Sequence, residues 1–353
     1  MEAAGKLGID PRGVLDFSSN TNPLGPSPNA LSSIKENIGR IALYPESDPV
    51  QLKNALAAQV DGLKSDNVVV GNGSIDLIYL FSRLACREGF EAVFPTPTFS
   101  EYERSARQLG SKVTYVSLRE PFMFTADDIL DRLTDLTRIV YVCDPNNPTS
   151  TTVGKQELLR IVQETNRKGI YVLVDEDCLD FVEDGSSKSL ASVVETYDNL
   201  VVLKSFTKTF GLPGLRIGYG FACTNLASAL RKLQPPWCVN SLAQIAASAA
   251  LGDLDHVQRA RELVNAERPR LARALREIGA VTSPCANFIL FRGNGSNWRS
   301  SVVHDRMLQK RILVRDCSTF RGLDNRYIRV SVRSRNENDV LLENLAQVKN
   351  GLG

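Results

Sequence analysis

Histidine is scarce in this sequence, and no metal site is indicated. Only His256 and His304 occur among 353 residues, and neither has a second type of ligand nearby at the spacing that metal sites use. No apolar run is long enough to cross a bilayer, and residues 1–8 have neither the basic start nor the apolar stretch of a signal peptide. The formal net charge is +2, without a run of like charges that would favour nucleic acid. These absences argue against a metalloprotein, a membrane protein, a secreted protein and a nucleic-acid-binding protein.

The seven cysteines are scattered, and their number is odd. No Cys-x-x-Cys pair is present, so we expect free thiols in the reducing cytoplasm. Hydrophobic residues make up 43% and charged residues 23% of the chain, which is typical of an ordinary soluble globular protein. A chain of this length has room for one large core and a second, smaller one.

The most informative stretch is Leu-Lys-Ser-Phe-Thr-Lys-Thr-Phe-Gly-Leu-Pro-Gly-Leu-Arg-Ile-Gly-Tyr at residues 203–219. Apolar runs at 200–203 and 217–221 predict strands on either side, and the Gly-Leu-Pro-Gly turn excludes a continuous helix. Ser205 and Thr207 precede Lys208, and Arg216 follows the turn. Hydroxyls and a guanidinium suit a phosphate, and a lysine amine can form an imine. The stretch therefore indicates an amine beside an anion site; a solvated loop with ordinary charges is the alternative.

A second candidate anion site follows the predicted strand at residues 68–70. The sequence Gly-Asn-Gly-Ser-Ile-Asp at 71–76 leads into an apolar helix that begins near residue 77. A strand, a glycine-rich turn and a helix N-terminus make a cradle of free backbone N–H groups for an anion. Asp76 stands where a dinucleotide-binding fingerprint needs its third glycine, so we reject a nucleotide-dependent oxidoreductase.

A carboxylate follows the continuous apolar run at residues 171–174, which predicts a strand buried on both faces. Asp175 at the end of such a strand is costly unless it meets a cation. Asp177, two residues later, has the simpler interpretation of a solvated loop carboxylate. Phe99, just after the predicted strand at 92–94, is by itself most simply an aromatic at the edge of the core.

These stretches resemble the motifs of the class I/II aminotransferases, a family that uses pyridoxal 5'-phosphate (PLP). The resemblance rests on Ser-Phe-Thr-Lys with Pro-Gly-Leu-Arg-Ile-Gly-Tyr, on Gly-Asn-Gly-Ser at 71–74 and on Asn-Asn-Pro-Thr at 146–149, and it extends from about residue 2 to about residue 345. It implies an α/β protein of PLP-dependent transferase fold type I, with a mostly parallel seven-stranded sheet between helices and a smaller α+β domain. We expect residues 46–250 to form the large PLP-binding domain. Residues 1–45, which start with a short helix within 1–14, and residues 251–353 would form the small domain.

The resemblance also implies roles for individual residues. Lys208 carries the Schiff base, and Asp175 pairs with the protonated pyridine nitrogen, so that the ring remains an electron sink. Phe99 lies flat on the pyridine ring, and Asn147 hydrogen-bonds the phenolic oxygen of the cofactor. The cofactor phosphate is held by Gly73, Ser74, Ile75, Ser205, Thr207 and Arg216, together with Tyr44 of a neighbouring subunit.

The substrate-binding residues implied by the resemblance are Asn22, Asn147, Arg315 and Arg329. Asn22 belongs to the loop Asn-x-Asn-Pro-Leu-Gly-Pro, which on its own is most simply a connector. Arg329 matches the family arginine that grips the substrate α-carboxylate through two hydrogen bonds. Isolated arginines such as Arg315 are by default surface charges. The role of Tyr44 implies that the active unit is at least a homodimer.

Three stretches resemble threonine-phosphate decarboxylases of cobalamin biosynthesis more than aminotransferases, at residues 15–25, 236–243 and 314–334. They imply decarboxylation of L-threonine O-3-phosphate to 1-amino-2-propanol phosphate through an external aldimine, with Lys208 as a candidate proton donor. The alternatives are a histidinol-phosphate-type aminotransferase, a related PLP enzyme for another phosphorylated amino acid, and a non-catalytic protein with this fold. Ser150, Asp177, Cys178 and Arg333 depart from the family pattern and leave room for a different substrate.

Overall fold

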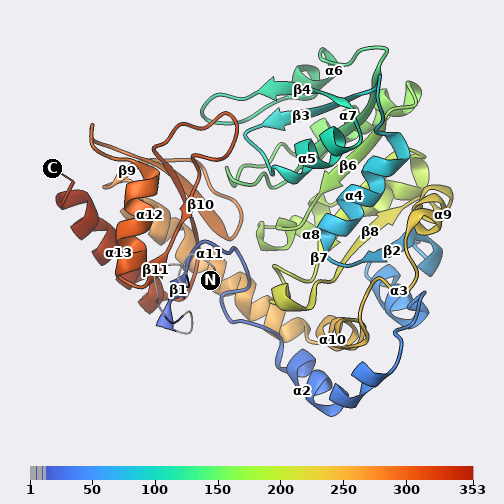
Figure 1. Cartoon of the computed structure of the whole chain (residues 1–353), viewed down its shortest axis with the longest axis horizontal. Helices are drawn as coiled ribbons and strands as arrows, with labels where there is room; N and C mark the ends of the chain where they lie inside the picture. The colour runs from blue at the N-terminus through green and yellow to red at the C-terminus, as the bar shows by residue number, and fades with distance from the viewer. Residues whose placement is uncertain (1–4, 6–9, 11–12, 353) are drawn as a thin grey trace.

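The computed structural model describes residues 5 and 10 and residues 13–352, so most of the helix expected within residues 1–14 lies outside the described part of the chain. Figure 1 shows two sheet-containing units, one built on a large twisted sheet wrapped by helices and one formed mainly by the C-terminal third. The N-terminal segment crosses from the second unit to the helices below the first.

The large sheet has seven strands in the order β2-β8-β7-β6-β5-β3-β4. Only β8 runs antiparallel to its neighbours, and the other pairs are parallel, which confirms the predicted mostly parallel sheet. The strands are β2 (Val68–Gly71), β3 (Glu91–Thr96), β4 (Lys112–Ser117), β5 (Thr137–Cys143), β6 (Tyr171–Asp175), β7 (Leu200–Ser205) and β8 (Gly218–Ala222).

Both faces of this sheet are covered, because the central strands are apolar at consecutive positions. Val172 and Val174 of β6 pack into the core on one face, and Leu173 between them packs into the core on the other. The helices of this unit are α3 (Val50–Ala57), α4 (Ser74–Ala85), α5 (Glu101–Gln108), α6 (Ala126–Leu130), α7 (Lys155–Arg167), α8 (Gly185–Lys188), α9 (Thr224–Leu233) and α10 (Ser241–Leu251).

The second unit contains a four-stranded antiparallel sheet in the order β12-β13-β10-β9. Its strands are β9 (Gly279–Val281), β10 (Phe288–Gly293), β12 (Arg315–Asp316) and β13 (Tyr327–Ser331), and its helices are α11 (Leu254–Leu275), α12 (Ser300–Gln309) and α13 (Arg335–Asn350). A separate parallel pair joins β1 (Leu15–Asp16) to β11 (Ile312–Leu313).

The N-terminal segment therefore contacts both units: β1 pairs with the C-terminal third, and α2 (Pro28–Glu36) packs against α10. This path carries residues 18–26 across the junction of the two units (Figure 1). The division of the chain at residues 46 and 250 stays a prediction.

A proline in a helical sequence predicts a break, but α11 continues through Pro269. A proline removes the N–H that would bond to the carbonyl four residues earlier, here that of Asn265. Both Pro269 and Asn265 are exposed, so water can satisfy the released carbonyl.

Cys86, Cys143, Cys178, Cys223, Cys238, Cys285 and Cys317 are all free thiols, as the sequence predicted. Among the described residues, no helix combines the length and the apolar character needed to span a membrane.

Candidate active site

A cleft of about 640 Å³ lies where the carboxyl ends of the central parallel strands meet the second unit. Open α/β sheets bind their ligands at this edge because loops from several strands converge there. The cleft is lined by residues from three parts of the chain: Ser18, Ser19, Asn20, Thr21, Phe99, Ser100, Asn147, Thr207, Lys208, Pro213, His304, Leu313, Val314, Arg315, Asp316, Phe320 and Arg329.

Lys208 lines this cleft from the loop after β7, and its Nζ donates a 3.4 Å hydrogen bond to Oδ1 of Asn20. Asn20 is buried, and its Nδ2 donates to the Cys178 thiol at 3.3 Å. The sequence prediction missed Asn20 and chose Asn22 in the same loop. Asn22 does not line the cleft, since its amide groups bond to the backbone of Thr209 and Leu24 at 2.8 Å each.

Asp175 ends β6 with its side chain buried and held from two sides. The hydroxyl of Tyr102 donates to its Oδ2 at 2.7 Å, and the backbone N–H of Asp177 donates to its Oδ1 at 3.0 Å. Burial, reinforced by the nearby Asp177 carboxylate, raises the pKa of Asp175 to about 7. A carboxyl group in this state is suited to a cationic partner, which would restore its ionised form.

The predicted phosphate cradle brings together the N-terminus of α4 and the guanidinium of Arg216. Gly73 has a φ of +84°, and a Cβ at this position would lie 2.3 Å from Nη2 of Arg216. A Cβ on Gly218 would lie 2.4 Å from the backbone nitrogen of Ser74. Ser74 begins α4, whose first N–H groups have no partner within the helix, and Ile75 follows it. The two glycines thus allow an arginine and a helix N-terminus to converge on one anion.

The hydroxyl residues of the lysine motif lie beside this cradle. Oγ of Ser205 accepts a hydrogen bond from the backbone N–H of Thr207 at 3.1 Å, which fixes the turn before Lys208. Arg216 has a left-handed backbone conformation with a φ of +56°, and its Nη1 donates to the carbonyl of Pro213 at 3.2 Å. The turn therefore directs Arg216 back toward Gly73.

Arg329 is the buried cation on the other side of the cleft. Its two terminal nitrogens donate to Oδ1 of Asn147 and, at 2.6 Å, to the carbonyl of Ser18, and its Nε has no partner within the described residues. Its guanidinium lies over the ring of Phe288 at 5.3 Å from the centroid. Burial lowers the pKa of Arg329, and the positive charge of Arg315 acts in the same direction.

The remaining predicted residues fall into two groups. Phe99 lines the cleft and meets the ring of Tyr102 edge-on, with centroids 5.7 Å apart. Tyr44 does not line the cleft; it is 83% exposed and packs against Trp237 with ring centroids 5.1 Å apart. Within one chain, the structure therefore brings together the lysine, carboxylate, arginine and cradle residues but leaves Tyr44 outside.

Comparisons with known proteins agree with this arrangement. The model of the family described as aminotransferase class I and II matches residues 12–345. The chain belongs to the class I and II aminotransferase family. The histidinol-phosphate aminotransferase of Moorella thermoacetica is 35% identical over 349 residues, covering 98% of this chain and 88% of that protein.

Two further comparisons concern one relative in sequence and one solved structure. A protein of Caldanaerobacter subterraneus subsp. tengcongensis with the provisional name threonine-phosphate decarboxylase is 33% identical, covering 93% of this chain and 88% of its own length. The histidinol-phosphate aminotransferase of Sinorhizobium meliloti, solved in complex with pyridoxal-5'-phosphate, is similar in structure with a TM-score of 0.90 at 21% identity, covering 100% of this chain and 95% of that chain.

The cofactor of this family is PLP, and the residues of the cleft, together with the cradle and the end of β6, fit it. The Gly73–Arg216 cradle suits a phosphate, the buried Asp175 suits a protonated ring nitrogen, and the amine of Lys208 suits the aldehyde.

Proposed function

We propose that this PLP-dependent enzyme decarboxylates L-threonine O-3-phosphate to 1-amino-2-propanol phosphate, the linker of the cobalamin nucleotide loop. The observation that carries the proposal is the pairing of two arginines. Arg315 on β12 stands directly opposite Arg329 on β13 in an antiparallel ladder, and both line the cleft. Like charges directly opposite each other on neighbouring strands are destabilising, so the pair favours a ligand with two anionic groups.

The two arginines differ in a way that suits two different anions. Arg329 is buried and held in place by hydrogen bonds, as expected of an arginine that binds a carboxylate through two hydrogen bonds. Arg315 is exposed. Among the described residues its guanidinium donates a 3.3 Å hydrogen bond to the hydroxyl of Thr319 and lies over the ring of Phe320 at 5.3 Å from the centroid, so most of its N–H groups remain available. His304 and Thr21 also line the cleft, and polar groups of this kind suit a phosphate. L-Threonine O-3-phosphate carries a carboxylate and a phosphate on one small molecule.

Each of these side chains has a separate role in the proposed reaction. PLP, when bound, supplies the electron sink that makes a bond to the α-carbon breakable. Asp175 keeps the ring nitrogen protonated by its negative charge, with Tyr102 orienting the carboxylate. Arg329 and Asn147 orient the substrate, and Lys208 returns a proton to the α-carbon after carbon dioxide has left.

A histidinol-phosphate aminotransferase is the second candidate, and the relative from Moorella thermoacetica favours it. That reaction uses the same lysine, carboxylate and cradle but loses a proton, not carbon dioxide, from the carbon bearing the amine. It also requires a keto acid such as 2-oxoglutarate for its second half. Histidinol phosphate has no carboxylate, so Arg329 would serve only the keto acid in this scheme.

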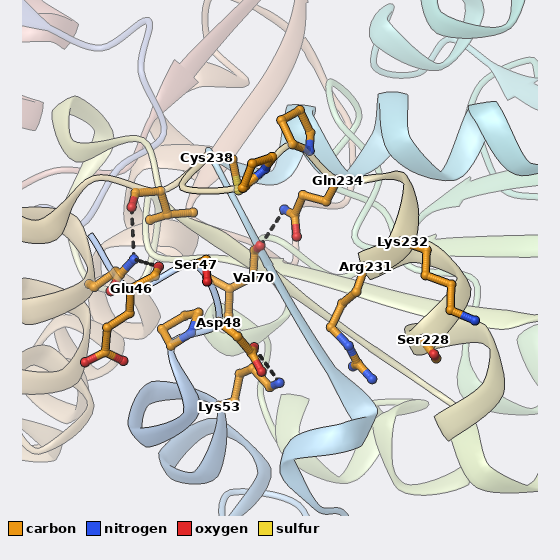
Figure 2. A pocket seen from close by; sticks show the side chains of 15 residues that line it. Glu46, Ser47, Asp48, Lys53, Val70, Ser228, Arg231, Lys232, Gln234 and Cys238 are labelled. Atoms are coloured by element: carbon orange, nitrogen blue, oxygen red, sulfur yellow. Dashed lines mark hydrogen bonds and ion pairs between the residues drawn. The ribbon is translucent and has the colours of Figure 1, made fainter. Parts of the chain in front are cut away.

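We extend the proposal to a homodimer in which Tyr44 reaches the cradle of the neighbouring subunit. The exposed apolar residues Leu31, Ile38, Ile41, Leu43, Tyr44 and Trp237 lie on or beside the arm that contains α2. Next to this arm is a separate cavity of about 420 Å³, with Arg231 and Lys232 across from Asp48 and Lys53 (Figure 2). Its wall includes Val70 of β2, the strand that leads into the cradle, so a partner subunit bound here would lie close to the cradle.

The free cysteines also fit a location in the reducing cytoplasm.

The experiment is a comparison of two reactions on the same PLP-loaded preparation. One contains O-phospho-L-threonine without a keto acid, and the other contains histidinol phosphate with 2-oxoglutarate. The proposal expects carbon dioxide and aminopropanol phosphate in equal amounts from the first. Turnover in the second alone would replace it with the aminotransferase.

A further inference from the structure

Asp177 is a second carboxylate beside Asp175, and the reaction described above gives it no role. It is half-buried, and not the fully solvated loop residue expected from the sequence. Its Oδ1 is out of contact with solvent and has no hydrogen-bond partner within the described part of the chain. A carboxylate in this position requires a cation nearby, because an unpaired buried charge is costly.

Two lysines, Lys204 and Lys208, act electrostatically on Asp177, and one of them is already paired. Nζ of Lys204 lies 3.3 Å from Asp180 and 3.6 Å from Glu176. Nζ of Lys208, by contrast, has only its long 3.4 Å hydrogen bond to the neutral amide of Asn20 among the described contacts. Of these two lysines, Lys208 is therefore the one that has no counter-charge among the described contacts.

The electrostatics of Asp177 point to the same partner. Burial raises the pKa of Asp177, and the positive charge of Lys208 is the strongest influence that opposes the rise. The other charged or titratable groups facing Asp177 are Asp175 on β6, Cys178 beside it, Asp180 on η4 (Leu179–Phe181), Lys204 on β7 and Tyr219 on β8.

We propose that Asp177 is the counter-ion of the Lys208 side-chain nitrogen, a positioning residue that keeps this nitrogen protonated while PLP is attached to it. Asp175 then neutralises the ring nitrogen of the cofactor, and Asp177 neutralises the nitrogen that joins the cofactor to the chain. Two adjacent carboxylates that repel each other in the cofactor-free protein would thereby each meet one cation. A counter-charge of this kind would keep the nitrogen protonated up to a higher pH.

The test is a pH titration of the PLP-loaded protein by absorbance, since the spectrum of the imine at Lys208 changes when its nitrogen loses the proton. We expect Asp177→Asn to lower the pKa of this transition by about one unit or more, the size of effect that a nearby opposite charge produces. Asp177→Glu should restore most of the shift. No substrate is added, so the outcome does not depend on which reaction the enzyme catalyses.

Asp180→Asn is the matched control, because it removes a neighbouring carboxylate whose contacts are to Lys204, Arg261 and Thr209. It should leave the transition where it is in the wild type. An unchanged pKa in Asp177→Asn, or an equal shift in Asp180→Asn, would overturn the proposal. If circular dichroism shows that Asp177→Asn is not folded, the smaller Asp177→Ser is titrated with the same expectation.

Discussion

Arg216 approaches Gly73 so closely that a single methyl group on the glycine would occupy the position of the guanidinium. The hypothetical Cβ lies 2.3 Å from Nη2, and the glycine has a φ of +84° that other residues rarely adopt. Gly73→Ala should therefore displace Arg216 and weaken PLP binding by roughly ten- to a hundredfold, because losing a hydrogen bond to a charged group costs about 1.5–3 kcal/mol. A titration of the cofactor-free protein with PLP measures this.

Gly25 provides the control for that variant. It also has a positive φ, +77°, but apart from its chain neighbours no described residue has an atom within 4 Å of its hypothetical Cβ. Gly25→Ala should share the backbone strain while leaving PLP affinity near that of the wild type. Equal losses in the two variants would mean that strain, and not the displaced arginine, explains the effect.

Arg329→Lys tests whether Arg329 binds the carboxylate of the substrate. A lysine cannot donate at once to Asn147, to Ser18 and to a substrate carboxylate. We expect kcat/KM for O-phospho-L-threonine to fall by roughly thirtyfold or more, which corresponds to about 2 kcal/mol. Arg292→Lys on the neighbouring strand, where the arginine pairs with the exposed Asp324, should have little effect. Similar losses in both variants would contradict the role of Arg329.

The pKa of Asp175 predicts how the stability of the cofactor-free protein depends on pH. The pKa rises from 3.8 to about 7 on folding, so the folded state binds more protons than the unfolded one between these values. The stability contributed by the protonated group is complete below pH 3.8 and is lost as the pH rises through about 7. Asp175→Asn should remove this decline, and the difference between the two melting curves across this range measures it. A parallel pH dependence in both proteins would contradict the assignment.

Complementation tests whether Tyr44 acts across a subunit boundary. Tyr44→Ala and Lys208→Ala homodimers should each be strongly impaired. A mixed dimer contains one site with an intact Lys208 and an intact Tyr44 from the partner, so mixing the two variants under exchange conditions should recover activity. If Tyr44 serves its own chain, no site in the mixture is complete and no activity returns.

The sequence predicted the residues whose roles are local to a motif. Lys208, Arg216 and the glycine turn at 71–73 lie on loops that follow apolar strands, and the strand pattern alone brings those loops to one edge of the sheet. Asp175 was identified because a carboxylate at the end of a buried strand needs an explanation.

The residues that were missed depend on tertiary packing. Asn20 meets Lys208 across 188 positions of the chain, and Tyr102 meets Asp175 across 73. Nothing in the local pattern around Asn20 distinguishes it from Asn22, two residues later. The burial of the Asp177 oxygen likewise arises only when β6 and β7 lie side by side.

The most direct test of the central claim is the rate of carbon dioxide release from O-phospho-L-threonine and from L-threonine, with PLP present and no keto acid. The opposed arginines predict that the phosphorylated substrate is turned over at least about a hundredfold more efficiently, and that Arg315→Ala removes most of this preference. Equal rates for the two amino acids, or release that requires a keto acid, would contradict a decarboxylase built for a substrate with two anionic groups.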